Sequence, residues 1–469
     1  MTKFMNLETD YLVIGSGAAG MAFTDALIAA SGAQVVMVDR RHAPGGHWHD
    51  AYPFVTLHQP SSYYGVNSTP LGSDAIDGDG PNKGLYERAG ASEICAYYRR
   101  VMERTLLPSG QVRYFPMSDY LGEGRFISRA SGVQYDVNVR RKIVDARYLQ
   151  PSVPARVPPP FEVATGARCI PVNDLPQMTE HADGYVIIGA GKTSIDACLW
   201  LLEIGVAPED IRWIKPREAW LVNRVFAQGG ELVGTLFEGI SLQVEAAARA
   251  ASLDDLFERL NATAQLLRVD ERVTPDMYKG ATVSAYELEQ LRRIEQVVRR
   301  GRVRRIDRDA IVLDNGAIDT SPRHLHVHCA AAGLNPAPAV PMFTDDRITL
   351  QPIRAGLIPF NAAVVGFVEA TRDDTGEKNR LCPVNPLPDV PLDWVRGTIV
   401  GMNADYAWSK EPDITDWLER ARLNPSRGLR RRTGEPRLQQ AWARYTEHVR
   451  AGLTNLRRLS VSGSTNLVI

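Results

Sequence analysis

The sequence predicts an α/β protein with two parallel sheets, and two glycine turns with the segments around them are the observations that predict it. Each turn follows a short apolar strand and opens a helix, at residues 15–20 in the first copy and 189–194 in the second. Strands that alternate with helices in this way are typical of a parallel sheet. The two copies share their topology and not their sequence, so we expect two related domains.

Apolar periodicity and the positions of glycine and proline predict the individual elements. The first unit has a strand at Tyr11–Ile14, the turn at Gly15–Gly20, a helix at Met21–Ala30 and a strand at Gln34–Val38. The second has a strand at Tyr185–Ile188, the turn at Gly189–Gly191, a helix at Thr193–Leu202 and a strand at Ile211–Ile214. Elsewhere we expect strands near Gln111–Phe115, Gly124–Ser128, Lys142–Tyr148, His324–Ala331 and Val364–Val368. We also expect a linker at Pro151–Pro160 and a hairpin at Val303–Asp319 that turns at Asp314–Gly316. Helices are expected over residues 231–300 and after Asp413.

Size and composition exclude several classes of protein. A chain of 469 residues suggests two or three domains, and 44% hydrophobic with 23% charged residues is ordinary for a globular protein. The net charge of −1 gives no overall attraction to nucleic acid or anionic lipid. No apolar run is long enough to span a membrane, and the first is too short for the core of a signal peptide. We therefore expect a cytoplasmic protein.

Cysteine and histidine patterns argue against disulfide and metal chemistry. The five cysteines are widely spaced, and no two form a Cys-x-x-Cys pair. A disulfide framework, a zinc ribbon and a redox-active cysteine pair are therefore not expected. His324, His326 and His328 alternate along a strand, which is more typical of one face of a half-buried strand than of metal ligands, so we expect no metal site.

The first glycine turn has the pattern that binds a dinucleotide. Gly15 permits the tight turn, Gly17 lets the backbone approach a pyrophosphate, and Gly20 allows the helix to pack closely on the strand. The N-terminus of the helix offers free N–H groups to the phosphates. Asp39 ends the following strand, where a carboxylate can accept hydrogen bonds from ribose hydroxyls.

The residues after Asp39 carry a resemblance to a known family. Pro44-Gly45-Gly46-His47-Trp48 resembles the G-G-x-W segment of the flavin-containing monooxygenase superfamily, which includes Baeyer–Villiger and N-hydroxylating enzymes. Gly189-Ala190-Gly191 fits the second, NADPH-binding turn of that family, and Cys329–Gly333 and Ala164–Gly166 resemble its two crossings between domains. The resemblance implies two Rossmann-like domains. It assigns residues 1–170 and 325–469 to an FAD-binding domain, and residues 171–324, with a helical insertion at about 231–300, to an NADPH-binding domain. The FAD contacts that it implies are Gly15, Ser16, Gly17, Ala19, Gly20, Asp39, Arg40, Gly46, His47 and Trp48.

The second turn departs from the ideal pattern, because Ser194 stands where a third glycine or alanine is usual. A small serine still permits close packing, so Gly189, Gly191, Lys192 and Thr193 remain candidates for binding NADPH. A Walker A interpretation of Lys192-Thr193 fails, because residue 186 is a valine and not the required glycine. Lys215 and Arg217 follow the next strand, where cations suit the 2′-phosphate of NADPH; the alternative is a solvated loop.

Candidates near the reacting ring of the flavin come from residues 57–67. In the resembled family the equivalent stretch carries a hydrogen-bonding side chain beside the flavin, and His58, Gln59 or Asn67 would supply it here. The alternative is a polar loop that only supports the cofactor.

The resemblance implies an FAD- and NADPH-dependent monooxygenase that oxygenates a small organic substrate with molecular oxygen through a C4a-(hydro)peroxyflavin. Two alternatives stay open: a flavin-dependent dehydrogenase or oxidase without a stable peroxyflavin, and a non-catalytic FAD- or NADP-binding protein. The arginine-rich tail, with its run at residues 430–432, is interpreted as a solvated helical face or, second, as a homodimer contact. No nucleic-acid partner is expected.

Overall fold

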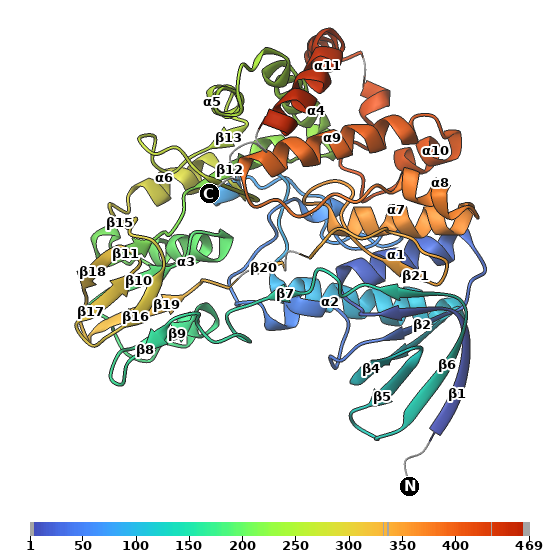
Figure 1. Ribbon diagram of the computed structural model, residues 1–469, viewed down its shortest axis with the longest axis horizontal. Helices are drawn as coiled ribbons and strands as arrows, with labels where there is room; N and C mark the ends of the chain where they lie inside the picture. Colours follow the sequence, from blue (N-terminus) through green and yellow to red (C-terminus); the bar gives the residue numbers. More distant parts are fainter. Residues whose placement is uncertain (1–3, 332, 335–336, 433, 463–469) are drawn as a thin grey trace.

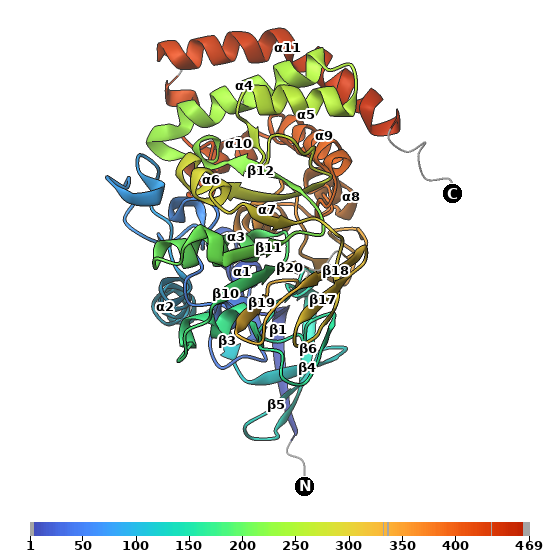
Figure 2. The same cartoon turned by 90° about the vertical axis from the view of Figure 1, so that its left-hand side faces the viewer.

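The computed structural model describes residues 4–331, 333–334, 337–432 and 434–462. Figure 1 shows two α/β units side by side, one at the lower right and one at the lower left, beneath a layer of helices. Figure 2 shows that this layer lies across one end of the molecule, opposite the N-terminal strand. The predicted fold class, α/β with two Rossmann-like sheets, is confirmed.

The first unit is a sheet in the strand order β3-β2-β1-β6-β5-β4. Its strands are β1 (Phe4–Ile14), β2 (Val35–Val38), β3 (Val112–Phe115), β4 (Ser118–Gly122), β5 (Arg125–Ser128), β6 (Gln134–Asp145) and β21 (Arg347–Thr349). Strands β3, β2, β1 and β6 run parallel, and β21 returns late in the chain to pair with the end of β6. Strand β1 is longer than predicted, whereas the four-residue core Tyr11–Ile14 and the helix after it are confirmed.

Side-chain alternation along β1 builds two cores on opposite faces of this sheet. Tyr11 and Val13 pack with the helices α1 (Ala18–Ala30), α2 (Ala91–Val101) and α7 (Ile358–Thr371). Leu12 and Ile14 pack against the β4–β5 meander. The contact between α1 and α7 is close, because a Cβ at Gly366 would lie 2.5 Å from the Phe23 carbonyl oxygen.

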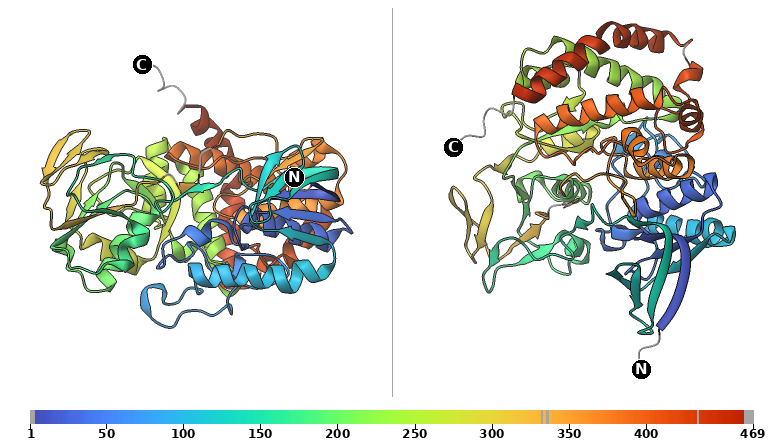
Figure 3. Two further views of the ribbon diagram at one scale, coloured as in Figure 1. Left: turned by 90° about the horizontal axis from the view of Figure 1, so that it is seen from below. Right: turned by 45° about the vertical axis from the view of Figure 1, so that its right-hand side comes forward.

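The second unit repeats this plan. Its sheet is all parallel, in the order β15-β11-β10-β19-β9. The strands are β9 (Cys169–Pro171), β10 (Gly184–Ile188), β11 (Ile211–Ile214), β15 (Gln296–Val298) and β19 (His324–His328). Helices α3 (Lys192–Glu203) and α6 (Ala285–Arg292) pack on one face, and a small sheet of β8 (Glu162–Val163), β16 (Val303–Ile306), β17 (Ala310–Leu313) and β18 (Gly316–Asp319) packs on the other. Figure 3 shows the two units side by side from below.

A helical layer joins two segments that are far apart in sequence. Helices α4 (Val233–Arg249) and α5 (Leu253–Ala262) lie with α9 (Pro391–Trp408) and α11 (Pro436–Ser462). They cover a three-stranded sheet of β12 (Ala219–Asn223), β13 (Leu266–Leu267) and β14 (Met277–Val283). The C-terminal helices α9 and α11 therefore pack on α4 and α5 of the insertion. Helices α10 (Pro412–Arg420) and α8 (Thr375–Leu381) pack against α9. Across the described ranges, no helix is long and apolar enough to cross a membrane.

Several predicted elements are corrected by the structure. Val364–Val368 lies inside helix α7 and not in a strand. The prediction failed because α7 is buried almost all round, so its sequence shows no amphipathic period. The helical prediction for residues 231–300 is wrong at β13, β14 and β15, whose short apolar runs carry no period of their own. The hairpin that turns at Asp314 is confirmed between β17 and β18.

One of the expected crossings between the units differs from the structure. Ala164–Gly166 follows β8, which pairs with β16 inside the second unit, so this segment is not a crossing. The chain passes between the units at β7 (Pro151–Ser152) and returns at β20 (Gly333–Leu334), and these two strands pair antiparallel. Strand β19 pairs with β10 and β9, so the second sheet extends past residue 324. Residue 332 of the expected return crossing lies outside the described residues.

Candidate functional site

The first glycine turn has the geometry that its sequence predicts. Gly15 has φ +108°, a conformation that favours glycine, and its N–H donates to the Val38 carbonyl. A Cβ at Gly20 would lie 2.0 Å from the Gly15 carbonyl oxygen, so helix α1 can pack on the turn only with glycine there. Gly17 caps α1 without any side-chain hydrogen bond, and the first turn of the helix holds no acidic residue. The N–H groups of this helix end are therefore left for an anionic ligand.

The carboxylate of Asp39 lies at the edge of the sheet beside this turn. It is buried, and its Oδ2 accepts hydrogen bonds from the Ser16 N–H (2.6 Å) and the Ser16 hydroxyl (2.9 Å). Its Oδ1 accepts one from the N–H of Arg41 at 2.8 Å. Asp39 thus holds the turn in shape. The neighbouring Arg40 is exposed.

The segment Gly46–Trp48 lies directly on the first turn. The N–H of Gly45 donates to the Ser16 carbonyl at 3.0 Å, and a Cβ at Gly46 would lie 3.0 Å from the Gly17 Cα. Trp48 donates its indole N–H to the Tyr64 hydroxyl at 2.7 Å, and the His47 ring stacks on Trp48. The structure therefore brings together the two segments that carry the predicted FAD contacts.

Burial also changes the acid–base behaviour of this segment. Burial, reinforced by the charge of Arg41, lowers the pKa of His47 to about 4. The imidazole of His47 is therefore neutral at pH 7.

The second glycine turn is built in the same way and faces open space. Gly189 has φ +146°, and a Cβ there would lie 3.0 Å from the Cys329 carbonyl oxygen. A Cβ at Gly191, in contrast, would meet nothing within 4 Å. Ser194 is buried and donates its hydroxyl hydrogen to the Gly191 carbonyl at 2.7 Å, so serine fills the place of the third glycine without displacing the helix.

Lys192 and Thr193 of this turn lie in a small polar network with Asp196 and Tyr52, which were not predicted. Lys192 forms an ion pair with Asp196 one turn along α3. Asp196 also accepts a hydrogen bond of 2.6 Å from the hydroxyl of Tyr52, which comes from the first unit. Thr193 lies beside the same Tyr52 hydroxyl. The second turn is therefore tied to the segment that follows Trp48.

The two cations after β11 differ sharply in accessibility. The side chain of Lys215 is 3% exposed, forms an ion pair with Glu218 and lies 4.5 Å from the ring centre of Trp213. Burial lowers the pKa of Lys215, and Glu218 opposes that shift. The side chain of Arg217 is 27% exposed and pairs with Asp389 at 2.7 Å. Of these two cations, only Arg217 is accessible to a ligand, because Glu218 holds Lys215 inside the protein.

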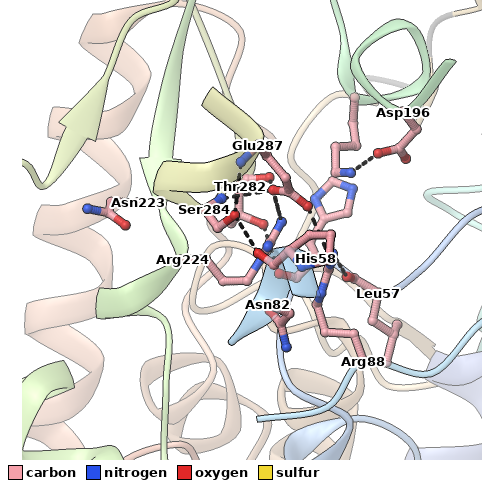
Figure 4. A network of polar contacts seen from close by, with 12 residues as sticks. Leu57, His58, Asn82, Arg88, Asp196, Asn223, Arg224, Thr282, Ser284 and Glu287 are labelled. Atoms are coloured by element: carbon pink, nitrogen blue, oxygen red, sulfur yellow. Dashed lines mark hydrogen bonds and ion pairs between the residues drawn. The ribbon is translucent and has the colours of Figure 1, made fainter. Parts of the chain in front are cut away.

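His58 belongs to a charged cluster between the units, which we call the arginine cluster: His58, Arg88, Lys192, Arg224 and Glu287 (Figure 4). Glu287 accepts from Arg224 at 2.5 Å through one carboxylate oxygen and from Arg88 at 3.2 Å through the other. Burial opposes the charged carboxylate, yet Arg224, Lys192 and Arg88 together hold the pKa of Glu287 below its ordinary value. Burial and the same three cations lower the pKa of His58. The ring of His58 is therefore neutral.

The arginine cluster was not visible in the sequence, because its residues come from separate elements. Arg88 precedes α2, Arg224 follows β12, and Glu287 lies in the first turn of α6. Ser284 and Glu287 form a capping box at the start of α6, with a Ser284 hydroxyl to Glu287 N–H distance of 3.2 Å. The sequence Ser-x-x-Glu could have placed this helix start, although not its arginine partners.

The other predicted residues near the flavin are separated. Asn67 accepts a hydrogen bond of 3.1 Å from the N–H of Leu423, and so contacts the C-terminal segment. Arg422, beside it, donates to the carbonyl oxygens of Tyr64 and Val66. Gln59 is half-buried next to His58. His58 therefore lies in the arginine cluster, whereas Asn67 contacts the C-terminal segment.

Asp374, Lys378 and His326 have structural roles. Asp374 caps α8, and Lys378 forms a buried ion pair of 2.7 Å with Glu369. His326 is held between the Arg168 carbonyl and the Thr320 hydroxyl. No cluster of residues suited to a metal ion occurs in the part of the chain that the structure describes.

Comparison with known proteins gives one family match and several relatives. Residues 13–63 match the NAD(P)-binding Rossmann-like domain family, so the first turn, Gly46–Trp48 and His58 all lie inside the match. The uncharacterized protein Rv2000 of Mycobacterium tuberculosis is 51% identical over 419 residues, which cover 89% of this chain and 78% of that protein. The uncharacterized protein Mb2023 of Mycobacterium bovis gives the same figures, at 51%, 89% and 78%.

Solved structures are similar at a much lower level. A flavin-containing monooxygenase from Stenotrophomonas maltophilia is 14% identical, with 88% of this chain and 99% of that chain covered and a TM-score of 0.42. Cyclohexanone-bound cyclohexanone monooxygenase is 12% identical, with 95% and 99% covered and a TM-score of 0.46. The bacillithiol disulfide reductase of Staphylococcus aureus is 12% identical, with 78% and 97% covered and a TM-score of 0.43. Values this low do not assign a function.

Proposed function

The chain belongs to one family with the mycobacterial proteins Rv2000, MT2056 and Mb2023, and we propose that it is an FAD-dependent oxidoreductase that uses NADPH to oxygenate a small organic substrate. The observation that carries the proposal is the presence of two glycine-turn helices without a side-chain cap, α1 and α3, each of which follows a parallel strand of its sheet. One such site suits a resident dinucleotide, and the second suits a dinucleotide that brings electrons.

The first turn supports the FAD assignment. The N–H groups at the start of α1 would hold the pyrophosphate, and the Asp39 carboxylate would accept from a ribose hydroxyl. Gly46 has no side chain and can therefore lie close to Gly17, and Trp48 donates a hydrogen bond to the Tyr64 hydroxyl. FAD, when bound, supplies the hydride and oxygen chemistry. The side chains of this segment would position the cofactor and exclude water from it.

The second turn supports a nicotinamide nucleotide. The open space over Gly191 leaves room for a pyrophosphate at the start of α3, where Lys192 adds a positive charge. Arg217 would contact the 2′-phosphate of NADPH by exchanging its partly exposed ion pair with Asp389 and its hydrogen bonds to the Asp276 and Asp389 carbonyls. Lys215 would not contact it, since Glu218 holds it inside the protein.

The reaction type is tested by following the oxygen. The purified holoprotein is supplied with NADPH, ¹⁸O₂ and a panel of amines, sulfides, ketones and organic acids, and products are analysed by mass spectrometry. We expect one labelled oxygen atom in a product. Consumption of NADPH with only hydrogen peroxide formed, for every compound, would instead show an oxidase. Protein that holds FAD and consumes no NADPH would show a non-catalytic binding protein.

A further inference from the structure

We propose that the arginine cluster binds an oxyanion, the carboxylate of the substrate, so that the protein acts on a small organic acid. The assignment of this ligand as a substrate rests on the proposed function, whereas its binding does not. Arg88, Arg224 and Glu287 lie side by side with His58 next to them (Figure 4).

Arg224 carries unused hydrogen-bond donors inside the protein. Its side chain is 0% exposed, and its Nη2 donates to Glu287 at 2.5 Å and to the Thr282 carbonyl at 3.4 Å. Its Nε and Nη1, and the Nε of Arg88, have no hydrogen-bond partner within the described residues. Leaving charged donors buried and unpaired is costly, and native proteins rarely do so without a ligand, ion or water. These three donors are therefore available to an acceptor that the chain itself does not supply.

The charges of the cluster leave a positive excess. Arg88 and Arg224 share the single carboxylate of Glu287, at 3.2 Å and 2.5 Å. Lys192 shares Asp196 with the Tyr52 hydroxyl. Three cations thus face two carboxylates, and burial together with these cations lowers the pKa of His58. One bound anion would balance the cluster.

The position of the cluster favours the substrate over the nucleotide as the source of this anion. A nucleotide pyrophosphate would bind at the start of α3, which only Lys192 of the cluster occupies. Arg88 comes from the first unit, and Arg224 follows β12 under the helical layer. His58 is half-buried, and the side chain of Arg224 is fully buried. Guanidinium groups bind planar carboxylates through several donors at once, which suits a small organic acid.

The test measures binding without turnover. Oxidised protein is titrated with benzoate and hexanoate, with their amides, with inorganic phosphate and with NADP⁺, and affinity is read by calorimetry and by the thermal unfolding midpoint. We expect the carboxylates to bind and the amides not to bind. Changing Arg224→Met or Arg88→Gln should weaken carboxylate binding by about tenfold or more. Arg437→Gln, which removes an ion pair with Glu238 in the helical layer, is the matched control and should leave it unchanged.

Three results would overturn the proposal. The first is that amides bind as well as carboxylates or that neither binds, in which case water alone satisfies Arg224. The second is that the two cluster variants bind carboxylates like the control. The third is that NADP⁺ or phosphate competes with benzoate and loses affinity in the same variants, which would make the anion a nucleotide phosphate. If Arg224→Met does not fold, Arg88→Gln gives the answer alone. Calorimetry on the oxidised protein reads binding without turnover, so a failure of the proposed function and a failure of this site are distinguishable.

Discussion

The hydroxyl of Tyr52 donates a hydrogen bond of 2.6 Å to Oδ2 of Asp196, and this bond joins the two dinucleotide-type units. Two residues along, Phe54 stacks on Trp200, with the ring centres 4.9 Å apart and the planes at 16°. The segment after Trp48 therefore docks along helix α3 and fixes where the second glycine turn lies relative to the first. A hydride donor bound at α3 would be positioned by this segment.

Replacing Tyr52 should loosen that connection. In Tyr52→Phe, the half-buried Asp196 keeps Lys192 and loses its hydroxyl donor, so the free energy of unfolding should fall by about 1–3 kcal/mol. Urea unfolding monitored by circular dichroism measures this change. Tyr286→Phe removes a hydroxyl from an exposed tyrosine of the same unit and serves as the control. Equal stability of the two variants would show that the Tyr52 bond contributes nothing.

A methyl group at Gly191 should separate folding from nucleotide binding. Because a Cβ there meets nothing within 4 Å, Gly191→Ala should fold and keep its flavin. The methyl group would occupy the space over the turn, so the apparent KM for NADPH should rise by about tenfold or more. Steady-state kinetics with NADPH provides the measurement. Gly32→Ala, also free of contacts within 4 Å, should leave KM unchanged. An unchanged KM in Gly191→Ala would place the nucleotide elsewhere.

The two cations after β11 should respond differently to removal. Arg217→Ala should raise the KM for NADPH more than the KM for NADH, since only NADPH carries the 2′-phosphate. Lys215→Met should mainly lower stability, by about 1–3 kcal/mol, because Glu218 keeps Arg299 at 2.6 Å and loses its buried partner. Kinetics with both nucleotides and thermal unfolding together distinguish these effects. If Lys215→Met shifts the nucleotide preference and Arg217→Ala does not, our assignment of the two cations is reversed.

Acid should destabilise the protein partly through His47. Its folded pKa of about 4 lies below the ordinary value of 6.5, so the unfolded chain binds a proton first as the pH falls. The contribution of His47 is complete above pH 6.5 and is lost progressively between 6.5 and about 4. His47→Gln should therefore lose less stability than the parent protein between these two pH values. The comparison is made by urea unfolding at each pH, with His42→Gln, an exposed histidine of the same segment, as the control. Parallel stability curves for His47→Gln and the parent would contradict the prediction.

Local sequence signals predicted the two glycine turns, because the constraints on Gly15 and Gly20 arise from the backbone within one strand–helix unit. The same signals failed at Val364–Val368, where burial on all sides of α7 removes the period that distinguishes a helix from a strand. The cation at position 215 was visible in the sequence. Its burial was not, because it depends on the contacts with Glu218 and Trp213 after folding.

The arginine cluster could not be predicted from the sequence at all. Arg88, Arg224 and Glu287 are brought together from three separate segments, and no spacing in the sequence connects them. The unused donors of Arg224 are a property of its surroundings and not of its neighbours in the chain. Sites of this kind become visible only when the packing between units is known.

We propose that one chain holds FAD at the first turn and receives electrons from NADPH at the second. The most direct test is to mix the purified protein with NADPH in the absence of oxygen and to record the absorbance of bound flavin. We expect the oxidised flavin spectrum to bleach, and to bleach much more slowly in Gly191→Ala, which keeps the first turn intact. Protein that carries no flavin, or flavin that NADPH and NADH both leave oxidised, would contradict the account.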